Sequence, residues 1–274
     1  MSKFIISGFA DEISNDLSEQ LATLNELGIK HMEMRNVNGK CIVDYTIDEV
    51  KEFKKQLDAA GVKLSAVGSP IGKIKITDDF EPHLEKFKHT LEIAKVLEAP
   101  YIRMFSFFID SDDVAEDYTE EVLKRWKAFE DAARGSGVTL LHENEKGIYG
   151  DVDYRCKTVL DNVDNNVVKG IFDPANFVQC GVDTKAAFAL LRDKIVYMHI
   201  KDALKSDGTV VPSGEGDGNV AYILGELANA GYEGFLSLEP HLLTGDIAVC
   251  GVPMFKKAYD ALMNIVKSLD VEIA

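Results

Sequence analysis

Short apolar runs alternate with longer amphipathic stretches along the whole chain. The apolar runs have the length, and the β-branched and aromatic content, of buried strands. These predicted strands cover residues 4–9, 30–35, 63–68, 101–106, 138–143, 168–173, 195–200 and 235–240. The amphipathic stretches between them predict helices over residues 15–27, 46–60, 79–97, 117–136, 151–162, 183–192, 219–230 and 253–269.

Several of the predicted helices have recognisable ends. Thr46 precedes a stretch with acidic residues in its first turn, and Gly61 follows the last residue of that stretch. Such residues are favoured at the N-cap and just after the C-terminus of a helix. Leu21, Leu24 and Leu27 recur every three residues, which is typical of a helix that buries one face.

Eight strand-then-helix units predict parallel strands joined by helical crossovers. Dividing 274 residues by eight gives about 34 residues per unit, close to the size of a βα unit with its loops. An open doubly wound sheet ordinarily carries G-x-G-x-x-G after an early strand, and SGFADE at residues 7–12 lacks this pattern. With no linker or low-complexity stretch, the prediction is a single (β/α)8 barrel, an α/β fold over residues 1–274.

The composition excludes several classes of protein. The formal net charge of −16 opposes binding to polyanions, so nucleic acid is not an expected partner. No apolar run approaches ~18 residues and no signal peptide is evident, so a membrane span is not expected either. The four cysteines are scattered without a C-x-x-C pair, which suits the reducing cytoplasm.

Four polar residues near the ends of four successive predicted strands indicate a metal site. They are Glu143, Asp173, His199 and Glu239. In a (β/α)8 barrel all strands point their C-terminal ends at one opening, where reactive residues gather. Three carboxylates in a dry barrel mouth cannot all stay ionised without a counter-charge. Each of these residues alone is explained by an ion pair or by a position in the core. Together they predict a site for one divalent ion, Mn²⁺ or Mg²⁺, and Co²⁺ or Zn²⁺ is also compatible with these ligands.

Other polar residues at the same strand ends are candidates for substrate binding. Glu33 and Arg103 lie on the second and fourth predicted strands, and Glu145 follows the fifth. An arginine on a barrel strand is costly to bury, so Arg103 must have a partner. His142 is the second-last residue of the fifth predicted strand and is also expected near the mouth.

Lys201 and His241 stand two residues beyond the predicted ligands on their strands. Strand alternation therefore turns them to the same side as those ligands. Lys201 would hold a substrate oxygen or a phosphate, or form a salt bridge with Glu143 or Glu239, and both readings stay open. His241 has the same two readings.

Five segments resemble the xylose-isomerase-like barrel superfamily, specifically its sugar phosphate isomerase/epimerase family. They are LLHENEKGIYGD (140–151), GIFDPANF (170–177), YMHIKDA (197–203), GEGDGNV (214–220) and GYEGFLSLEPH (231–241). The resemblance runs along essentially the whole chain and implies the same four metal ligands. It also implies that Glu143 and Glu239 are catalytic, because in epimerases of this family the corresponding residues move the substrate proton from opposite faces. Family members often have a histidine where this chain has Asn176, which keeps a group that can bind substrate but removes a metal ligand.

The resemblance implies a metal-dependent isomerase or epimerase that abstracts an α-proton from a small-molecule sugar or cyclitol and forms an enediolate. A keto-inositol or keto-sugar dehydratase is the alternative on the same site. A nuclease acting on abasic DNA is disfavoured by the net charge and the few histidines, and a non-catalytic barrel by the intact ligand set. The basic groups expected at the mouth, Arg103, Lys146 and Lys201, are few, which favours an unphosphorylated substrate. A homodimer is compatible with the resemblance.

Overall fold

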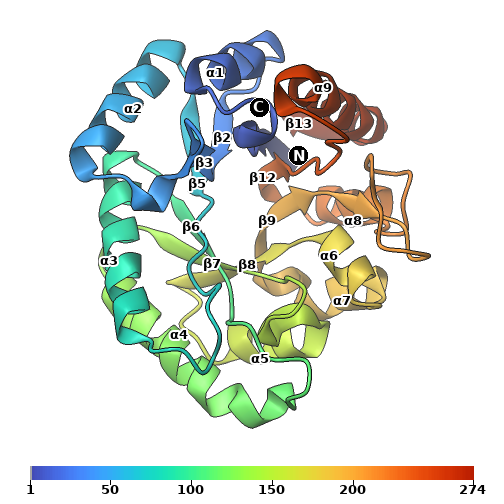
Figure 1. The fold of residues 1–274 in the computed structure, drawn as a ribbon. Coiled ribbons are helices and arrows are strands. Elements are labelled where there is room, and N and C mark those ends of the chain that lie inside the picture. The colour runs from blue at the N-terminus through green and yellow to red at the C-terminus, as the bar shows by residue number, and fades with distance from the viewer. Residues whose placement is uncertain (1) are drawn as a thin grey trace.

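The computed structural model describes residues 2–274 and contains parallel strands in a barrel surrounded by helices (Figure 1). The barrel strands are β1 (Ser2–Gly8), β2 (His31–Met34), β5 (Lys63–Val67), β6 (Tyr101–Met104), β7 (Thr139–Glu143), β8 (Val168–Phe172), β9 (Ile195–Ile200) and β12 (Glu233–Leu238). Neighbours pair in this order, and a parallel bridge between Phe9 and Glu33 joins β1 to β2. The predicted (β/α)8 fold is confirmed.

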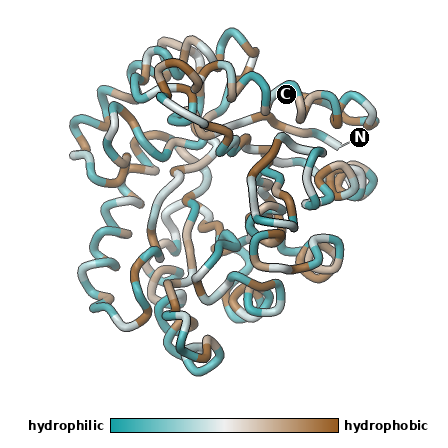
Figure 2. Tube along the Cα trace, turned by 45° about the vertical axis from the view of Figure 1, so that its right-hand side comes forward, coloured by the Kyte–Doolittle hydropathy of each residue, from teal (hydrophilic) through white to brown (hydrophobic). Residues whose placement is uncertain are grey.

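The main helices lie outside the strands. They are α1 (Leu17–Glu26), α2 (Ile47–Ala60), α3 (Glu81–Val96), α4 (Thr119–Ala133), α5 (Asp153–Asp161), α7 (Thr184–Leu191), α8 (Val220–Asn229) and α9 (Ile247–Val266). In Figure 2 they alternate between hydrophobic and hydrophilic positions, as expected for helices that bury one face. Among residues 2–274, no helix has both the length and the apolar character needed to cross a bilayer.

Shorter elements, which the apolar pattern does not predict, lie mainly in the loops. They are β3 (Asn36–Val37), β4 (Lys40–Cys41), β10 (Asp202–Ala203), β11 (Val210–Val211), β13 (Val271–Ile273), α6 (Pro174–Gln179), and the 3₁₀ turns η1 (Ala10–Glu12), η2 (Ile42–Asp44), η3 (Ala115–Tyr118), η4 (Tyr149–Asp151) and η5 (Arg192–Lys194). Strand β13 pairs in parallel with β1, so the two ends of the chain lie side by side (Figure 1).

The last helix begins earlier than predicted. Helix α9 starts at Ile247, and Pro253 lies inside it. Asp246 caps the helix by accepting a hydrogen bond from the backbone N–H of Ala248 at 3.0 Å. The prediction was wrong because proline is favoured in the first turn of a helix and usually excluded from its interior.

Apolar side chains form one cluster inside the barrel and a second, larger cluster between the strands and the helices. The inner cluster consists of Ala66, Leu141, Ile171, Tyr197 and Phe235. Residues that point outward from the same strands, such as Leu140 and Met198, belong to the larger outer cluster. Because side chains alternate along a strand, Glu143 and His199 share the inner side two residues further on. The barrel therefore has an apolar floor beneath a polar layer at its C-terminal end.

Asp202 organises the glycine-rich loop that follows β11. Its carboxylate accepts hydrogen bonds from the backbone N–H groups of Gly214 (2.9 Å), Gly216 (3.1 Å) and Gly218 (2.8 Å). The side chain is fully buried, and a Cβ atom on Gly216 would lie 2.4 Å from its Oδ1. The loop can wrap around Asp202 this closely because positions 216 and 218 carry no side chain.

We expect Asp202→Asn to lower the free energy of unfolding by about 1–3 kcal/mol, because the amide leaves buried N–H donors without an acceptor. Urea unfolding measures this change. Asp207→Asn is the matched control, since Asp207 is an exposed aspartate nearby that accepts a hydrogen bond from the backbone N–H of Thr209. Equal stability of the Asp202 variant and the wild type would contradict this role.

His83 of α3 makes the stability of the fold dependent on pH. Its Nε2 accepts a hydrogen bond from the backbone N–H of Gly72 at 2.7 Å. Burial, followed by the charges of Lys86 and Arg125, lowers the pKa of His83 from 6.5 to about 4. Between these two pH values the unfolded chain binds more protons than the folded one, so stability is full above 6.5 and is lost as the pH falls towards 4.

The variant His83→Gln, which keeps an acceptor but does not titrate, should flatten this dependence. The expected change in slope is roughly 1 kcal/mol per pH unit or less, since the ring is only partly buried and solvent screens its charge. Urea unfolding at a series of pH values between 7 and 4 would measure it. An unchanged slope in the variant would show that His83 does not titrate in this range.

Candidate metal centre

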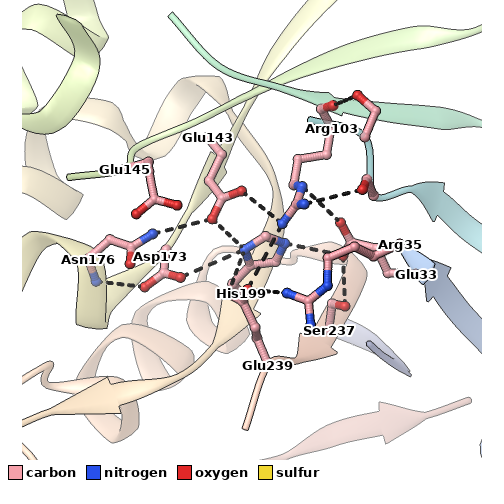
Figure 3. A network of polar contacts seen from close by, with 12 residues as sticks. Glu33, Arg35, Arg103, Glu143, Glu145, Asp173, Asn176, His199, Ser237 and Glu239 are labelled. Atoms are coloured by element: carbon pink, nitrogen blue, oxygen red, sulfur yellow. Dashed lines mark hydrogen bonds and ion pairs between the residues drawn. The ribbon is translucent and has the colours of Figure 1, made fainter. Parts of the chain in front are cut away.

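The four predicted ligands meet at the C-terminal end of the barrel (Figure 3). Glu143 ends β7, Asp173 follows β8, His199 lies on β9 and Glu239 follows β12. All four side chains are buried, and each offers a ligand atom within 4.8 Å of those of the others. His199 Nδ1 lies 3.0 Å from Glu143 Oε1, 3.6 Å from Glu239 Oε2 and 3.8 Å from Asp173 Oδ2.

The donor atoms of this cluster fit a divalent cation. Within the part of the chain that the structure describes, Glu143 Oε2 and Asp173 Oδ2 are buried and accept no hydrogen bond. Each of these oxygens faces a side-chain cation, since Arg103 Nη1 lies 3.4 Å from Glu143 Oε2 and Lys201 Nζ lies 2.8 Å from Asp173 Oδ2. Three buried carboxylates around one imidazole still concentrate negative charge, and a divalent cation is a partner that several of them can share. Three carboxylates and one imidazole form an oxygen-rich ligand set. Such a set suits Mn²⁺ or Mg²⁺, and it can also bind Co²⁺ or Zn²⁺.

Two asparagines hold the carboxylates in place. The side chain of Asn144 forms two hydrogen bonds with the backbone of Asp173. Its Oδ1 accepts from the N–H of Asp173 and its Nδ2 donates to the carbonyl, both at 2.9 Å. Asp173 Oδ1 in turn caps the short helix α6 by accepting from the N–H of Asn176 at 2.8 Å. The side chain of Asn176 donates to Glu143 Oε1 at 3.3 Å, so this predicted substrate-binding residue lies inside the cluster.

Lys201 is buried beside the ligands. Its Nζ lies 2.8 Å from both Asp173 Oδ2 and Glu239 Oε2. Burial disfavours its charge, but Asp173 and Glu239 outweigh burial and raise the pKa of Lys201. Burial also opposes the ionised form of Glu239, yet Lys201 holds the pKa of that carboxyl well below its usual range. Of the two salt bridges considered from the sequence, the one with Glu239 is present, and Asp173 takes the place of Glu143.

Two arginines complete the charge balance. Arg103 lies 3.4 Å from Glu143 Oε2 and donates to the carbonyl of Gly68 at 3.2 Å, so it has the ion-pair partner expected of a buried arginine. Arg35 lies 3.4 Å from Glu239 Oε1 and bonds Asp11 at 2.8 Å. Arg35 is not among the predicted site residues, although its place at the end of the second strand is the signal that would have found it.

The sequence of this barrel matches the model of a known protein family. The model of the xylose isomerase-like TIM barrel family matches residues 21–248, most of the chain. The chain belongs to this family. No curated protein matches its sequence.

Solved structures share the fold of this xylose isomerase-like barrel at low sequence identity. A zinc-bound IOLI protein superposes with a TM-score of 0.76 at 17% identity, over 98% of this chain and 99% of that one. The probable 3-DHS dehydratase AsbF from Bacillus anthracis gives 0.75 at 18% identity, over 96% and 99%. The 3-keto-D-glucoside 4-epimerase YcjR from E. coli gives 0.72 at 16% identity, over 97% and 100%.

The remaining predicted residues of the barrel lie at different depths. Glu33 is fully buried beneath His199, and its Oε2 lies 3.2 Å from His199 Nε2. Glu145 lies at the rim, 2.9 Å from Lys73 Nζ. His241 has a half-exposed side chain, and its Nε2 lies 3.3 Å from Glu239 Oε1. Burial would lower the pKa of His241, but Glu239 raises it.

His142 does not lie at the mouth, contrary to the prediction. Its ring packs edge-on against Trp126 at a centroid distance of 5.4 Å, and its Nε2 lies 3.0 Å from Ser106 Oγ. Burial lowers the pKa of His142 to about 3, so the imidazole is neutral. The prediction was wrong because neighbouring residues on a strand face opposite sides, and Glu143 takes the inner one.

Proposed function

We propose that this barrel is a divalent-metal-dependent isomerase or epimerase of a sugar or cyclitol. The observation that carries the proposal is the buried set of Glu143, Asp173, His199 and Glu239, whose ligand atoms all lie within 4.8 Å of one another. These four would hold Mn²⁺ or Mg²⁺. The bound ion would supply Lewis acidity that polarises the carbonyl of a ketone substrate.

The two glutamates would move the proton. Glu143 or Glu239 takes the α-proton, the C–H electron pair forms the double bond of an enediolate, and the carbonyl oxygen takes up the negative charge. Return of a proton to the same carbon from the opposite face gives an epimer. Return to the former carbonyl carbon gives the aldose–ketose isomer. Lys201 and Arg103 place positive charge beside both carboxylates and would stabilise the developing oxyanion.

A keto-sugar or keto-inositol dehydratase remains the alternative, because it needs the same proton abstraction followed by loss of hydroxide from the neighbouring carbon. Proteins of similar fold include a 3-keto-D-glucoside 4-epimerase and a probable 3-DHS dehydratase, which supports this class of chemistry without separating its members. The nuclease alternative is weakened because His142, one of its candidate zinc ligands, points away from the site.

The charges at the mouth favour an unphosphorylated substrate. Arg35, Arg103, Lys73 and Lys201 all lie within ion-pair distance of carboxylates. A phosphate would have to displace those carboxylates from their cations, whereas a hydroxyl group needs only a hydrogen bond.

Proton exchange in D₂O tests the proposed function. Ketoses, keto-cyclitols and their phosphates are incubated with the protein and Mg²⁺, or with Mn²⁺ that is chelated before the ¹H spectrum is recorded. We expect loss of the signal of a proton next to the carbonyl, faster with the free ketones than with the phosphates. No exchange in any ketone, with metal shown to be bound, would overturn the proposal.

A further inference from the structure

We propose that Glu33 is a positioning residue, which holds a proton on Nε2 of His199 and so presents Nδ1 to the metal. The inference rests on the metal centre of the proposed function. It replaces the role in substrate binding expected for Glu33 from the sequence.

The two nitrogens of His199 face different surroundings. Nδ1 points into the cluster, where Glu143, Asp173 and Glu239 all have an oxygen within 3.8 Å. Nε2 points to the other side and lies 3.2 Å from Glu33 Oε2 (Figure 3). An ion in the cluster therefore meets Nδ1, and the proton of the neutral imidazole must then reside on Nε2. Glu33 is an ionised acceptor at that nitrogen, which favours this tautomer and makes Nδ1 a stronger ligand.

Two hydroxyl groups, one from β9 and one from β12, hold Glu33 in place. Its Oε2 accepts from Tyr197 Oη at 2.9 Å and from Ser237 Oγ at 2.8 Å. Ser65 Oγ lies 2.8 Å from Tyr197 Oη, and Ser7 Oγ lies 2.6 Å from Ser65 Oγ. Since an ionised carboxylate only accepts, Tyr197 donates to it and is free to accept from Ser65, so the chain of hydrogen bonds has one direction.

Burial explains why this chain of hydrogen bonds favours a single set of donors and acceptors. Glu33, Tyr197, Ser237, Ser65 and Ser7 are all fully buried on the inner side of the barrel. The pairing of β2 with β5 shifts by one residue between Met32 and Glu33, a local irregularity of the kind that re-aims side chains near active sites. Glu33 contacts the Nε2 side of the His199 ring, whereas the three carboxylates of the cluster lie on its Nδ1 side, so Glu33 is linked to the metal centre through His199.

Co²⁺ binding to the metal-free protein tests the inference. The wild type and Glu33→Gln are titrated with Co²⁺ alone, and ¹H NMR is recorded on protein labelled with ¹⁵N at histidine. In the wild type we expect one slowly exchanging, strongly shifted imidazole N–H signal, because Nε2 keeps its proton in a buried site. Glu33→Gln should weaken Co²⁺ binding about 10–100-fold and shift or remove that signal.

Glu130→Gln is the matched control. Glu130 is a buried, ion-paired glutamate of α4 outside the barrel, so its loss affects stability without touching His199. Its Co²⁺ affinity and N–H signal should equal those of the wild type. Unchanged Co²⁺ affinity with an unchanged signal in Glu33→Gln would overturn the inference, as would the absence of any shifted imidazole N–H in the Co²⁺-loaded wild type.

This outcome is separable from that of the proposed function. The Co²⁺ titration needs no substrate, so it can succeed when no ketone exchanges its proton. Conversely, proton exchange with a ketone in a protein whose Glu33→Gln variant binds Co²⁺ normally would support the function and reject the positioning role.

Discussion

Replacing Glu239 by glutamine should lower turnover about 10²–10⁴-fold while the barrel stays folded. The variant removes a proposed metal ligand and one of the two proposed proton-transfer groups, since an amide cannot take a proton at neutral pH. It also removes the charge that pairs with Lys201 at 2.8 Å. The rate of α-proton exchange and the circular dichroism spectrum measure the two parts of this expectation.

Glu233→Gln is the control for this substitution. Glu233 begins the same strand, β12, and is exposed at the opposite end of the barrel from Glu239. Its variant should exchange substrate protons at the wild-type rate. Near-normal turnover in the Glu239 variant would remove that residue from the mechanism.

Lys201→Met should lower the free energy of unfolding of the metal-free protein by about 3–5 kcal/mol. The side chain keeps its bulk but loses the charge that faces Asp173 and Glu239, both buried. Asp173 then loses a cation at 2.8 Å, and Glu239 is left with the more distant Arg35 and His241 in a site with little access to water. Added Mn²⁺ should restore part of the loss, because the same carboxylates would then have a cation to share.

Urea unfolding with a chelator and again with Mn²⁺ measures both effects. Lys51→Met is the control, since Lys51 forms an exposed salt bridge with Asp48 that contributes little to stability. If metal-free Lys201→Met is as stable as the wild type, the buried ion pairs do not support the fold. If Mn²⁺ protects it no better than the control, the carboxylates do not share an ion.

Sequence patterns were sufficient for the parts of the site that depend on one strand at a time. Glu143 and His199 come at the polar ends of apolar strands, and parallel strands in a barrel bring such ends together. The same reasoning misplaced His142, because a strand end identifies a level in the barrel but the alternation of side chains decides the face. It also misplaced the start of α9, because a cap at Asp246 outweighs the cost of Pro253 within the helix.

The amino-acid sequence alone established the order of strands and helices. It also established that the four proposed ligands lie at the C-terminal ends of their strands. Both follow from periodicities within single segments, which are local properties of the sequence. Which charges pair with which was decided only by the folded chain. His199 and Glu33 are 166 positions apart, and Lys201 reaches Asp173 across two neighbouring strands. Such contacts depend on the curvature and register of the whole barrel, to which every strand contributes, so no single segment encodes them.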